Sequence, residues 1–361
     1  MKKIKLSLKG NGYAILIGDR ILSQLGQALK ALRMKEDAVV ITDHIVARYH
    51  LAGVVRSLKK DGFRTKPIVV PAGEHSKSIK MAMKVLQELA AYDVMKNVFI
   101  VALGGGVVGD LAGFVAAVYK RGVPYVQVPT TLLAQIDSAI GGKVAIDLPV
   151  GKNLVGAFYQ PKMVYSDVAF LSTLHRRQIR NGLAEAVKYG VIHDKNLFEF
   201  IEKNTSALLR GEKKHLVRLV EACSRIKAYV VMKDERETKG IRTILNFGHT
   251  LGHAIEAADG YNRYHHGEAI ALGMRMAAEI SSRLGLLNSD AAQRLNKVLT
   301  SLGLPQTVKG LKWKDILPLM LHDKKFRAGK NRFVLAKRIG QVCVKEGIPL
   351  QTIREAVETF V

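Results

Sequence analysis

Two histidines stand one helical turn apart in the segment ILNFGHTLGHAIE, residues 244–256. Residues i and i+4 of a helix share a face, so His249 and His253 could together bind one metal ion. The same side chains could instead transfer protons or fill a core, and a lone histidine on an apolar helix is more often structural. The residue types leave these three roles open.

Other metal donors lie elsewhere in the chain. A catalytic zinc site needs three protein ligands of the histidine and carboxylate type and one open position. The sequence offers Glu185, which small and apolar residues flank in NGLAEAVKYG, and His265 and His266 in HHGE. Lys188 shares a helix face with Glu185, so an ordinary salt bridge is the competing interpretation. Four histidines in two glycine-flanked clusters favour a metal site.

A glycine-rich turn indicates phosphate chemistry. In VALGGGVVGDLAGFVAAVY, residues Gly104, Gly105 and Gly106 separate a strand-like run from a helix-like run. The N–H groups at the start of such a helix suit a phosphate. We expect Asp110 in the first turn, where its charge suits the helix dipole. The spacing is not the G-x-G-x-x-G fingerprint, and a turn that only packs against a sheet is the alternative.

Polar residues also gather in the otherwise apolar stretch from residue 128 to residue 158. Lys143 and Lys152 each follow a glycine, and we expect turns to present their ammonium groups to phosphate or carboxylate. Exposed loop lysines are the alternative. Glu74 and Lys77 follow another strand-like run, where a solvated helix cap is the common outcome. The same stretch as the two lysines contains Thr130, Thr131, Asp137 and Asn153.

The elements that must position these groups differ between the two halves of the chain. Strand-like runs such as YAILIG, DAVVITD, TKPIVVPAG and NVFIVALGGG alternate with amphipathic helical runs in the first half, which predicts a parallel sheet covered by helices. Ligands of such sheets bind beyond the carboxyl ends of the strands. Beyond Leu171 most segments predict helices, and one hairpin is expected in RFVLAKRIGQVCV. We therefore predict a dinucleotide-binding α/β domain over residues 1–170 and a mostly helical domain over residues 171–361.

The charge of the chain is unusual. A formal charge of +25 accompanies an ordinary 24% of charged residues. The excess could attract an anionic small substrate, nucleic acid or acidic lipid, or belong to a generally basic surface. Without a nucleic-acid motif or an apolar run of membrane-spanning length, we expect neither a nucleic-acid nor a membrane partner. Two distant cysteines and no signal-peptide core predict a cytoplasmic protein.

Taken together, the motifs resemble those of the 3-dehydroquinate synthase family. The likeness runs from PAGEHSKS to HDKK and includes GGGVVGD, RGVPYVQVPTTLLAQIDSAIGGK, GKNLVGAFYQP, GLAEAVKYG, RTILNFGHTLGHAIE and HHGEAIALGM, in this order. It implies a Rossmann-like domain and a helical metal-binding domain. It also implies a reaction in which NAD⁺ transiently oxidises 3-deoxy-D-arabino-heptulosonate 7-phosphate. Phosphate is then eliminated, the hydride returns, and an intramolecular aldol step closes the ring, with zinc or cobalt polarising the oxidised oxygen.

The resemblance implies a role for each matching residue. The metal ligands would be Glu185, His249 and His266, with His253 beside the phosphate of the substrate. The NAD contacts would be Asp43, Glu74, Lys77, Gly105, Gly106, Val107, Asp110, Thr130, Thr131, Lys143, Lys152, Phe170 and Thr173. The substrate contacts would be Asp137, Lys143, Asn153, Lys188, Arg242, Asn246 and one or both of Lys324 and Lys325. Arg121 would reach the site of the partner subunit in a homodimer.

Three departures and several rivals accompany this resemblance. Val144, Asp147 and His175 replace residues that are usual in the family, without touching an implied metal ligand. Other sugar-phosphate cyclases, such as 2-deoxy-scyllo-inosose and valiolone synthases, act on substrates without a carboxylate, and the retained Arg242 argues against them. Iron- or zinc-dependent polyol dehydrogenases often pair an Asp with a His four residues later, whereas Glu185 here precedes Tyr189. A basic RNA- or membrane-binding protein that keeps the fold is the rival of another class.

Overall fold

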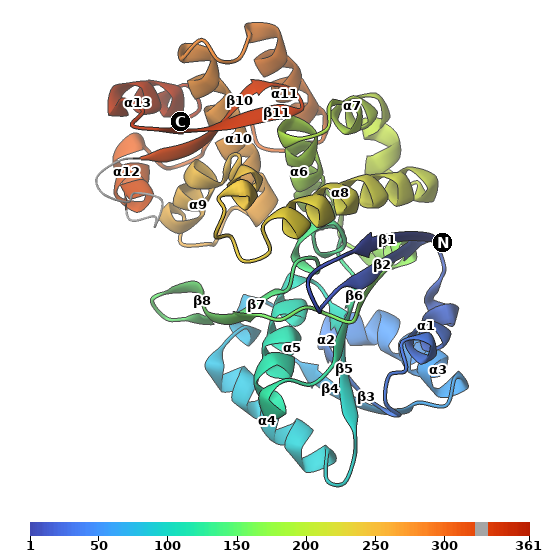
Figure 1. Ribbon diagram of the computed structural model, residues 1–361. Helices are drawn as coiled ribbons and strands as arrows, with labels where there is room; N and C mark the ends of the chain where they lie inside the picture. The colour runs from blue at the N-terminus through green and yellow to red at the C-terminus, as the bar shows by residue number, and fades with distance from the viewer. Residues whose placement is uncertain (322–330) are drawn as a thin grey trace. The chain divides into compact units, whose positions relative to one another are not determined.

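The computed structural model describes residues 1–321 and 331–361. Their contacts divide the chain into two compact units (Figure 1). Unit 1 consists of residues 1–175 and 216–236, and unit 2 consists of residues 176–215 and 237–361. Lys324 and Lys325, which the sequence placed among the substrate contacts, lie outside the described residues.

A seven-stranded sheet forms the centre of unit 1, in the order β1-β2-β9-β6-β5-β3-β4. The strands are β1 (Lys2–Leu6), β2 (Tyr13–Gly18), β3 (Asp37–Asp43), β4 (Arg64–Val70), β5 (Val98–Gly104), β6 (Tyr125–Pro129) and β9 (Met163–Asp167). Only the edge strand β1 runs antiparallel to its neighbour, and the other neighbouring pairs are parallel. The chain leaves β3 for β4 and returns on the opposite side at β5. This change of direction creates the switch point at which open α/β sheets bind ligands.

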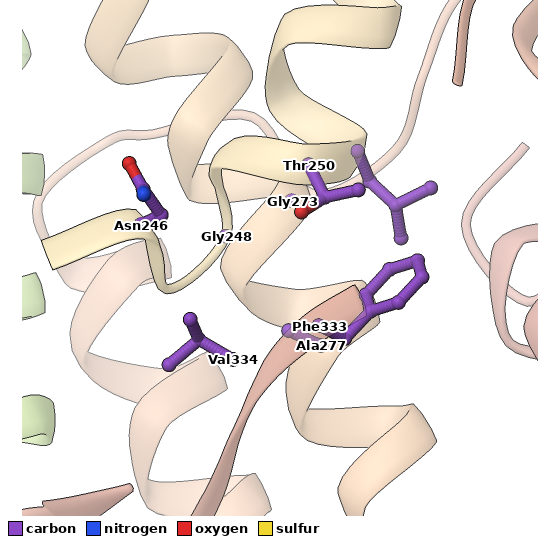
Figure 2. A pocket seen from close by; sticks show the side chains of 8 residues that line it. Asn246, Gly248, Thr250, Gly273, Ala277, Phe333 and Val334 are labelled. Carbon is purple, nitrogen blue, oxygen red and sulfur yellow. The ribbon is translucent and has the colours of Figure 1, made fainter. Parts of the chain in front are cut away.

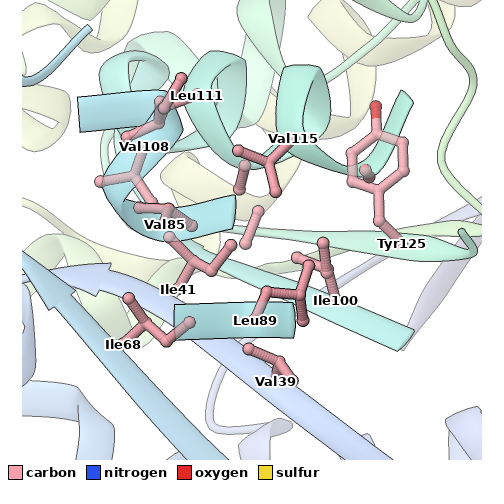
Figure 3. Packing of buried hydrophobic residues seen from close by; sticks show 14 of the residues in the cluster. Val39, Ile41, Ile68, Val85, Leu89, Ile100, Val108, Leu111, Val115 and Tyr125 are labelled. Atoms are coloured by element: carbon pink, nitrogen blue, oxygen red, sulfur yellow. The ribbon is translucent and has the colours of Figure 1, made fainter. Parts of the chain in front are cut away.

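Helices cover both faces of this sheet, which confirms the predicted fold class (Figure 1). On one face, α4 (Ile79–Tyr92) and α5 (Gly106–Val118) pack against strand residues such as Ile41 and Ile100 (Figure 3). On the other face, α1 (Leu25–Ala31) and α3 (Ala52–Lys60) pack against Val40 and Val101. The short helix α2 (His44–Val46) precedes α3. Strands buried on both faces explain why their sequences are continuous apolar runs.

A two-stranded hairpin of β7 (Lys143–Leu148) and β8 (Gly151–Phe158) lies outside the main sheet. The expectation that turns present Lys143 and Lys152 was wrong, because both lysines belong to strands of this hairpin. Val144 and Ile146 point into the core below α5, which anchors β7. Alternation of side chains then directs Lys143 away from that core, and the structure leaves it exposed.

Unit 2 is mostly helical, as predicted. Its helices are α6 (Arg176–Ile192), α7 (Lys195–Leu209), α9 (His249–Ala258), α10 (His266–Arg283), α11 (Ser289–Ser301), α12 (Trp313–Leu321) and α13 (Leu350–Glu358). The expected hairpin is present as β10 (Arg332–Arg338) and β11 (Gln341–Glu346). Every residue of α6 from Asn181 to Ile192 is buried, so this helix runs through the core of the unit.

Helix α8 (Lys213–Lys233) lies in the half of the sequence that we expected to form the helical domain, yet residues 216–236 belong to unit 1. Ser224 donates a hydrogen bond to the Gln135 carbonyl, and Gln160 donates one to Glu235, two residues beyond the helix. These contacts attach α8 to the segment after β6 and to the segment between β8 and β9. In the described part of the chain, no helix combines the length and apolarity that crossing a bilayer requires.

Candidate active site

Three helices of unit 2 bring the proposed metal ligands together. Glu185 lies on α6, His249 is the first residue of α9, and His266 is the first residue of α10. One oxygen of Glu185 lies 3.5 Å from His249 Nε2 and 3.6 Å from His266 Nε2. Nitrogen and oxygen donors that converge on one point are the set that zinc prefers.

Glu185 has the properties of an unsatisfied metal ligand. The carboxylate is fully buried and forms an ion pair with Lys188, confirming that the two side chains share a helix face. Neither oxygen has a well-aligned hydrogen-bond donor among the described residues. Burial alone would raise the pKa of Glu185, but the charges of Lys188 and His266 outweigh it and lower the pKa to about 2. A buried, ionised carboxylate whose second oxygen faces two imidazole nitrogens fits a cation well.

His266 is oriented through its second ring nitrogen. Its Nδ1 lies 3.3 Å from an oxygen of Glu256, which directs Nε2 toward Glu185. Carboxylates commonly fix metal-binding histidines in this way. Burial alone would lower the pKa of His266, but the hydrogen bonds to Glu185 and Glu256 raise it to about 10. Glu256 was missed at the sequence level, although it lies on α9 seven residues after His249.

The remaining two histidines take different positions. The metal-donor atoms of His249, His253 and His266 lie within 4.8 Å of one another, so His253 could replace Glu185 as the third donor. We favour Glu185 because it is buried and charged, whereas His253 is exposed. His265, the fourth candidate, caps the start of α10 and lies 3.1 Å from a Gln178 nitrogen.

The two remaining unit 2 candidates lie on the turn η7 (Ile241–Asn246), which leads into α9. Arg242 is almost fully buried, and its Nε lies 3.7 Å from a Glu237 oxygen. Asn246 lines a small crevice together with Thr250 and Phe333 (Figure 2). Most of the crevice wall consists of glycine and apolar side chains, so it is a packing defect behind α9 rather than a substrate site.

In unit 1, the proposed NAD contacts follow the carboxyl ends of parallel strands. Asp43 ends β3 and accepts hydrogen bonds of 2.9 Å from the first N–H groups of α2. Gly105, Gly106 and Val107 follow β5, and Thr130 and Thr131 follow β6. Glu74 and Lys77 follow β4, and Phe170 and Thr173 follow β9. The sheet topology therefore gathers residues from distant parts of the sequence at one edge, next to the switch point between β3 and β5.

Close packing explains the glycines after β5. A Cβ atom on Gly105 would lie 3.0 Å from Thr131 Cγ2, and one on Gly106 would lie 3.2 Å from Ser138 Oγ. A side chain at either position would crowd these neighbours, and its absence leaves the first N–H groups of α5 accessible to a phosphate. The geometry therefore fits a dinucleotide, although the sequence lacks the usual fingerprint.

Lys77 is the centre of a buried polar network, not a solvated cap. Its ammonium lies 2.7 Å from Asp110 and 4.0 Å from Asp147, and it donates a hydrogen bond to Asn153. The prediction that Asp110 lies in the first turn of α5 was wrong, because the helix begins four residues earlier at Gly106. Burial raises the pKa of Asp110 to about 6, although Lys77 acts in the opposite direction. Lys152, on the same hairpin as Asn153, lies 3.9 Å from Glu74.

Asp137 has a partner that the sequence reasoning missed. Asp137 lies in the helical turn η5 (Ala134–Ser138) and forms an ion pair with Lys227 of α8. Lys227 is 8% exposed. A signal was present in the sequence, because Lys227 interrupts the apolar stripe of α8 between Cys223 and Val230. A lysine at a position expected to be buried indicates a specific partner.

Arg121 lies apart from these clusters, on the turn η4 (Tyr119–Arg121) after α5. Arg121 and the preceding Lys120 have φ angles of 62° and 48°. Two successive left-handed residues with side chains are rare and turn the chain sharply toward Gly122. The structure therefore places Arg121 at a rigid corner of unit 1 and does not bring it to the residues after β5.

The parallel sheet with a ligand edge and the carboxylate–histidine cluster of the helical unit suit the class of NAD- and metal-binding enzymes. A solved 2-deoxy-scyllo-inosose synthase, complexed with carbaglucose-6-phosphate, NAD⁺ and Co²⁺, is 26% identical over 100% of both chains, with a TM-score of 0.91. The fold is also that of 2-epi-5-epi-valiolone synthase from Streptomyces hygroscopicus, solved with NAD⁺ and Zn²⁺, which is 24% identical over 98% of both chains with a TM-score of 0.88.

Residues 67–181 match the family model for the N-terminal part of 3-dehydroquinate synthase, and residues 182–326 match the model for its C-terminal part. A 3-dehydroquinate synthase from Desulforamulus reducens is 46% identical over 95% of this chain and 95% of its own length. The chain belongs to the 3-dehydroquinate synthase family.

Proposed function

We propose that this protein converts 3-deoxy-D-arabino-heptulosonate 7-phosphate into 3-dehydroquinate and phosphate, as a lyase of the shikimate pathway. The observation that carries the proposal is the similarity to a 3-dehydroquinate synthase, which is 46% identical over 95% of the chain. The substrate is an anionic sugar acid, which suits a chain with a formal charge of +25.

The proposed cofactors are NAD⁺ and a divalent metal ion, zinc or cobalt, as in the two structural neighbours. When bound, NAD⁺ supplies reversible hydride uptake and the metal ion polarises the oxygen at the oxidised carbon. Glu185, His249 and His266 hold the metal in this proposal. Their support is the buried Glu185 carboxylate, one oxygen of which lies within 3.6 Å of two imidazole nitrogens.

The residues near the metal complete its surroundings. Lys188 contacts one oxygen of Glu185 and keeps the carboxylate ionised, while the other oxygen faces His249 and His266. Glu256 holds the His266 ring with Nε2 facing the ligand position. His253 is exposed beside this cluster, and in this proposal it contacts the substrate phosphate and exchanges protons with it.

The residues at the carboxyl edge of the unit 1 sheet bind NAD⁺ in this proposal. The N–H groups at the start of α5 bind its diphosphate behind Gly105 and Gly106. Lys77 is held in place by Asp110 and Asn153 and provides a fixed positive charge near the cofactor. Lys143 and Lys152 are exposed on the β7–β8 hairpin, and in this proposal their ammonium groups contact NAD⁺.

Two separate sets of residues are proposed as substrate contacts. In unit 2, Arg242 and Asn246 lie near the two ends of η7 and provide a guanidinium and an amide for carboxylate or phosphate oxygens. In unit 1, Asp137 accepts hydrogen bonds from substrate hydroxyls while Lys227 holds its carboxylate. Lys227 thus joins the residues that the resemblance implied.

The protein is proposed to act in the cytoplasm as a homodimer, with Arg121 reaching the partner's site. Both cysteines are free thiols, Cys223 buried and Cys343 half-buried. Apolar side chains exposed on β8, Leu154 and Phe158, would be covered in a dimer. Sedimentation at micromolar concentration tests the assembly, and a monomer would contradict it.

The decisive experiment measures phosphate release from the heptulosonate phosphate, with and without NAD⁺, after chelation and after zinc is restored. Release that needs both cofactors and yields 3-dehydroquinate would confirm the proposal. Release without that product would indicate another elimination. If a protein loaded with both cofactors releases no phosphate from this substrate, turnover of a sugar phosphate without a carboxylate would instead identify it as a cyclase of the 2-deoxy-scyllo-inosose or valiolone type.

A further inference from the structure

One face of α6 carries a polar stripe that ends at the metal site. Arg177, Asn181 and Glu185 are spaced by four residues, so they project from the same side of the helix. The first turn of α10 packs along this stripe, and its first residue is His266. Two of the proposed metal ligands therefore belong to one helix–helix contact within unit 2.

Two sets of hydrogen bonds connect the helices along this stripe. The Asn181 side-chain oxygen accepts a hydrogen bond from the Gly267 N–H, the residue next to His266. One turn further from the metal site, the Arg177 guanidinium donates two hydrogen bonds, of 2.7 Å and 2.6 Å, to the two oxygens of Glu268. Such a two-point contact fixes orientation as well as distance.

The same Glu268 also helps to cap the start of α10. One of its oxygens accepts a hydrogen bond of 2.9 Å from the His265 N–H, which completes a capping box at the helix start. Arg177 donates a further hydrogen bond of 2.5 Å to the Arg263 carbonyl, in the segment that leads into α10. Contacts with α6 therefore help to fix where α10 starts. They also help to fix the position of His266, the first residue of α10.

Close backbone approach makes the contact inflexible. A Cβ atom on Gly267 would lie 2.6 Å from Asn181 Oδ1 and 2.8 Å from the Asn181 carbonyl carbon. The helices could not accommodate a side chain there without moving apart. This closest approach lies one residue from His266 and one helical turn from Glu185.

We propose that Arg177, Asn181, Gly267 and Glu268 form a clamp that sets the separation between Glu185 and His266. They act as positioning residues for the metal, and the inference rests on the proposed ligands. Zinc–ligand distances vary by only about 0.2 Å between good sites, so ligands on two helices need the helices held in register. Contacts beyond the ligands typically contribute about 10-fold to 100-fold in metal affinity.

The test measures Zn²⁺ affinity by competition with a chromogenic chelator, using the full chain and the variants Asn181→Ala and Arg177→Ala. Each variant is expected to bind zinc at least about tenfold more weakly. The absorption bands of the Co²⁺-loaded variants should shift, because the ligand geometry changes. Asn181→Asp keeps the acceptor for the Gly267 N–H and should restore most of the affinity.

A matched control comes from the same unit. Arg294 donates two hydrogen bonds, of 3.1 Å and 2.7 Å, to Glu202, joining α11 to α7. Its side chain is 39% exposed, against 41% for Arg177. Arg294→Ala therefore removes an equivalent helix–helix ion pair that no proposed ligand shares, and it should leave zinc affinity and the Co²⁺ spectrum unchanged.

The outcomes separate the clamp from the proposed function. If His266→Ala loses zinc while both clamp variants keep full affinity and unaltered Co²⁺ spectra, the clamp is overturned and the ligands stand. If His266→Ala keeps full zinc affinity, both ideas are overturned. Equal weakening by Arg294→Ala would also overturn the clamp, because general loosening of the unit would explain the effect. Should Asn181→Ala fail to fold, the half-exposed Arg177 provides the same comparison.

Discussion

The buried pair of Glu185 and Lys188 provides a quantitative test of the site in the metal-free protein. The side chains are 0% and 1% exposed, and their charges lie in direct contact. Removing one member of such a pair leaves an uncompensated buried charge, which costs about 3–5 kcal/mol. Replacing both members with apolar groups of similar size is often neutral or even stabilising.

The structure predicts which of the two single substitutions destabilises the protein more. Lys188→Met leaves Glu185 with a second cation, His266, 3.6 Å away, so it should lower the free energy of unfolding by about 3 kcal/mol. Glu185→Leu leaves Lys188 and His266 without the carboxylate that they share, so it should lower the free energy of unfolding by about 5 kcal/mol. The double variant should be at least about 2 kcal/mol more stable than the sum of the single costs predicts.

Urea unfolding followed by circular dichroism, with a chelator present throughout, gives these free energies of unfolding. The exposed pair of Arg354 and Glu358, 2.8 Å apart on α13, serves as the control. Arg354→Met should change the free energy of unfolding by no more than about 0.5 kcal/mol. Costs at Glu185 and Lys188 that add to within about 0.5 kcal/mol would refute the reasoning, since independent sites behave in that way.

Metal affinity, substrate use and NAD⁺ binding each allow a further test. Burial alone lowers the pKa of His266, but hydrogen bonds to two carboxylates raise it to about 10. Zinc must displace the proton that His266 then carries. The zinc affinity should therefore rise by up to about tenfold per pH unit from pH 7 toward this pKa. A flat profile would argue against His266 as a ligand. Lys227→Met releases the Asp137 carboxylate and should lower kcat/KM at least about tenfold, equivalent to about 1.4 kcal/mol, without altering zinc content. Gly106→Val crowds Ser138 and should weaken NAD⁺ binding in calorimetry, and unchanged binding would remove this turn from the site.

Local patterns were sufficient to predict much of the fold. The runs YAILIG and DAVVITD coincide with the full extents of β2 and β3, because strands buried on both faces must be apolar throughout. The helical runs around Glu185 and His249 were equally clear. The positions of histidines and carboxylates in the sequence also limited the metal site to a few residues. The fold brings His249 and His266 within 3.6 Å of one Glu185 oxygen.

Features that depend on tertiary packing could not be read in the same way. Each of the lysines in the β7–β8 hairpin follows a glycine, a pattern that indicates turns, and only the packing of the hairpin against α5 reveals strands. The position of Asp110 within α5 depended on where the helix begins, and the run of three glycines did not show that it begins at Gly106. The pairing of Lys227 with Asp137 spans ninety residues, and no local pattern predicts which partner such a lysine finds.

The placement of α8 has a consequence for how the protein is made. Unit 1 includes residues 216–236, so the chain enters unit 2 at residue 176 and returns before unit 2 is complete. On the ribosome, where synthesis advances at about 5–20 residues per second, unit 1 must wait several seconds for its last helix. Glu185 emerges during this delay, and His249 and His266 emerge only after α8. The metal site therefore cannot assemble until the sheet unit has all of its chain, and expressing residues 1–175 alone would leave that unit without α8.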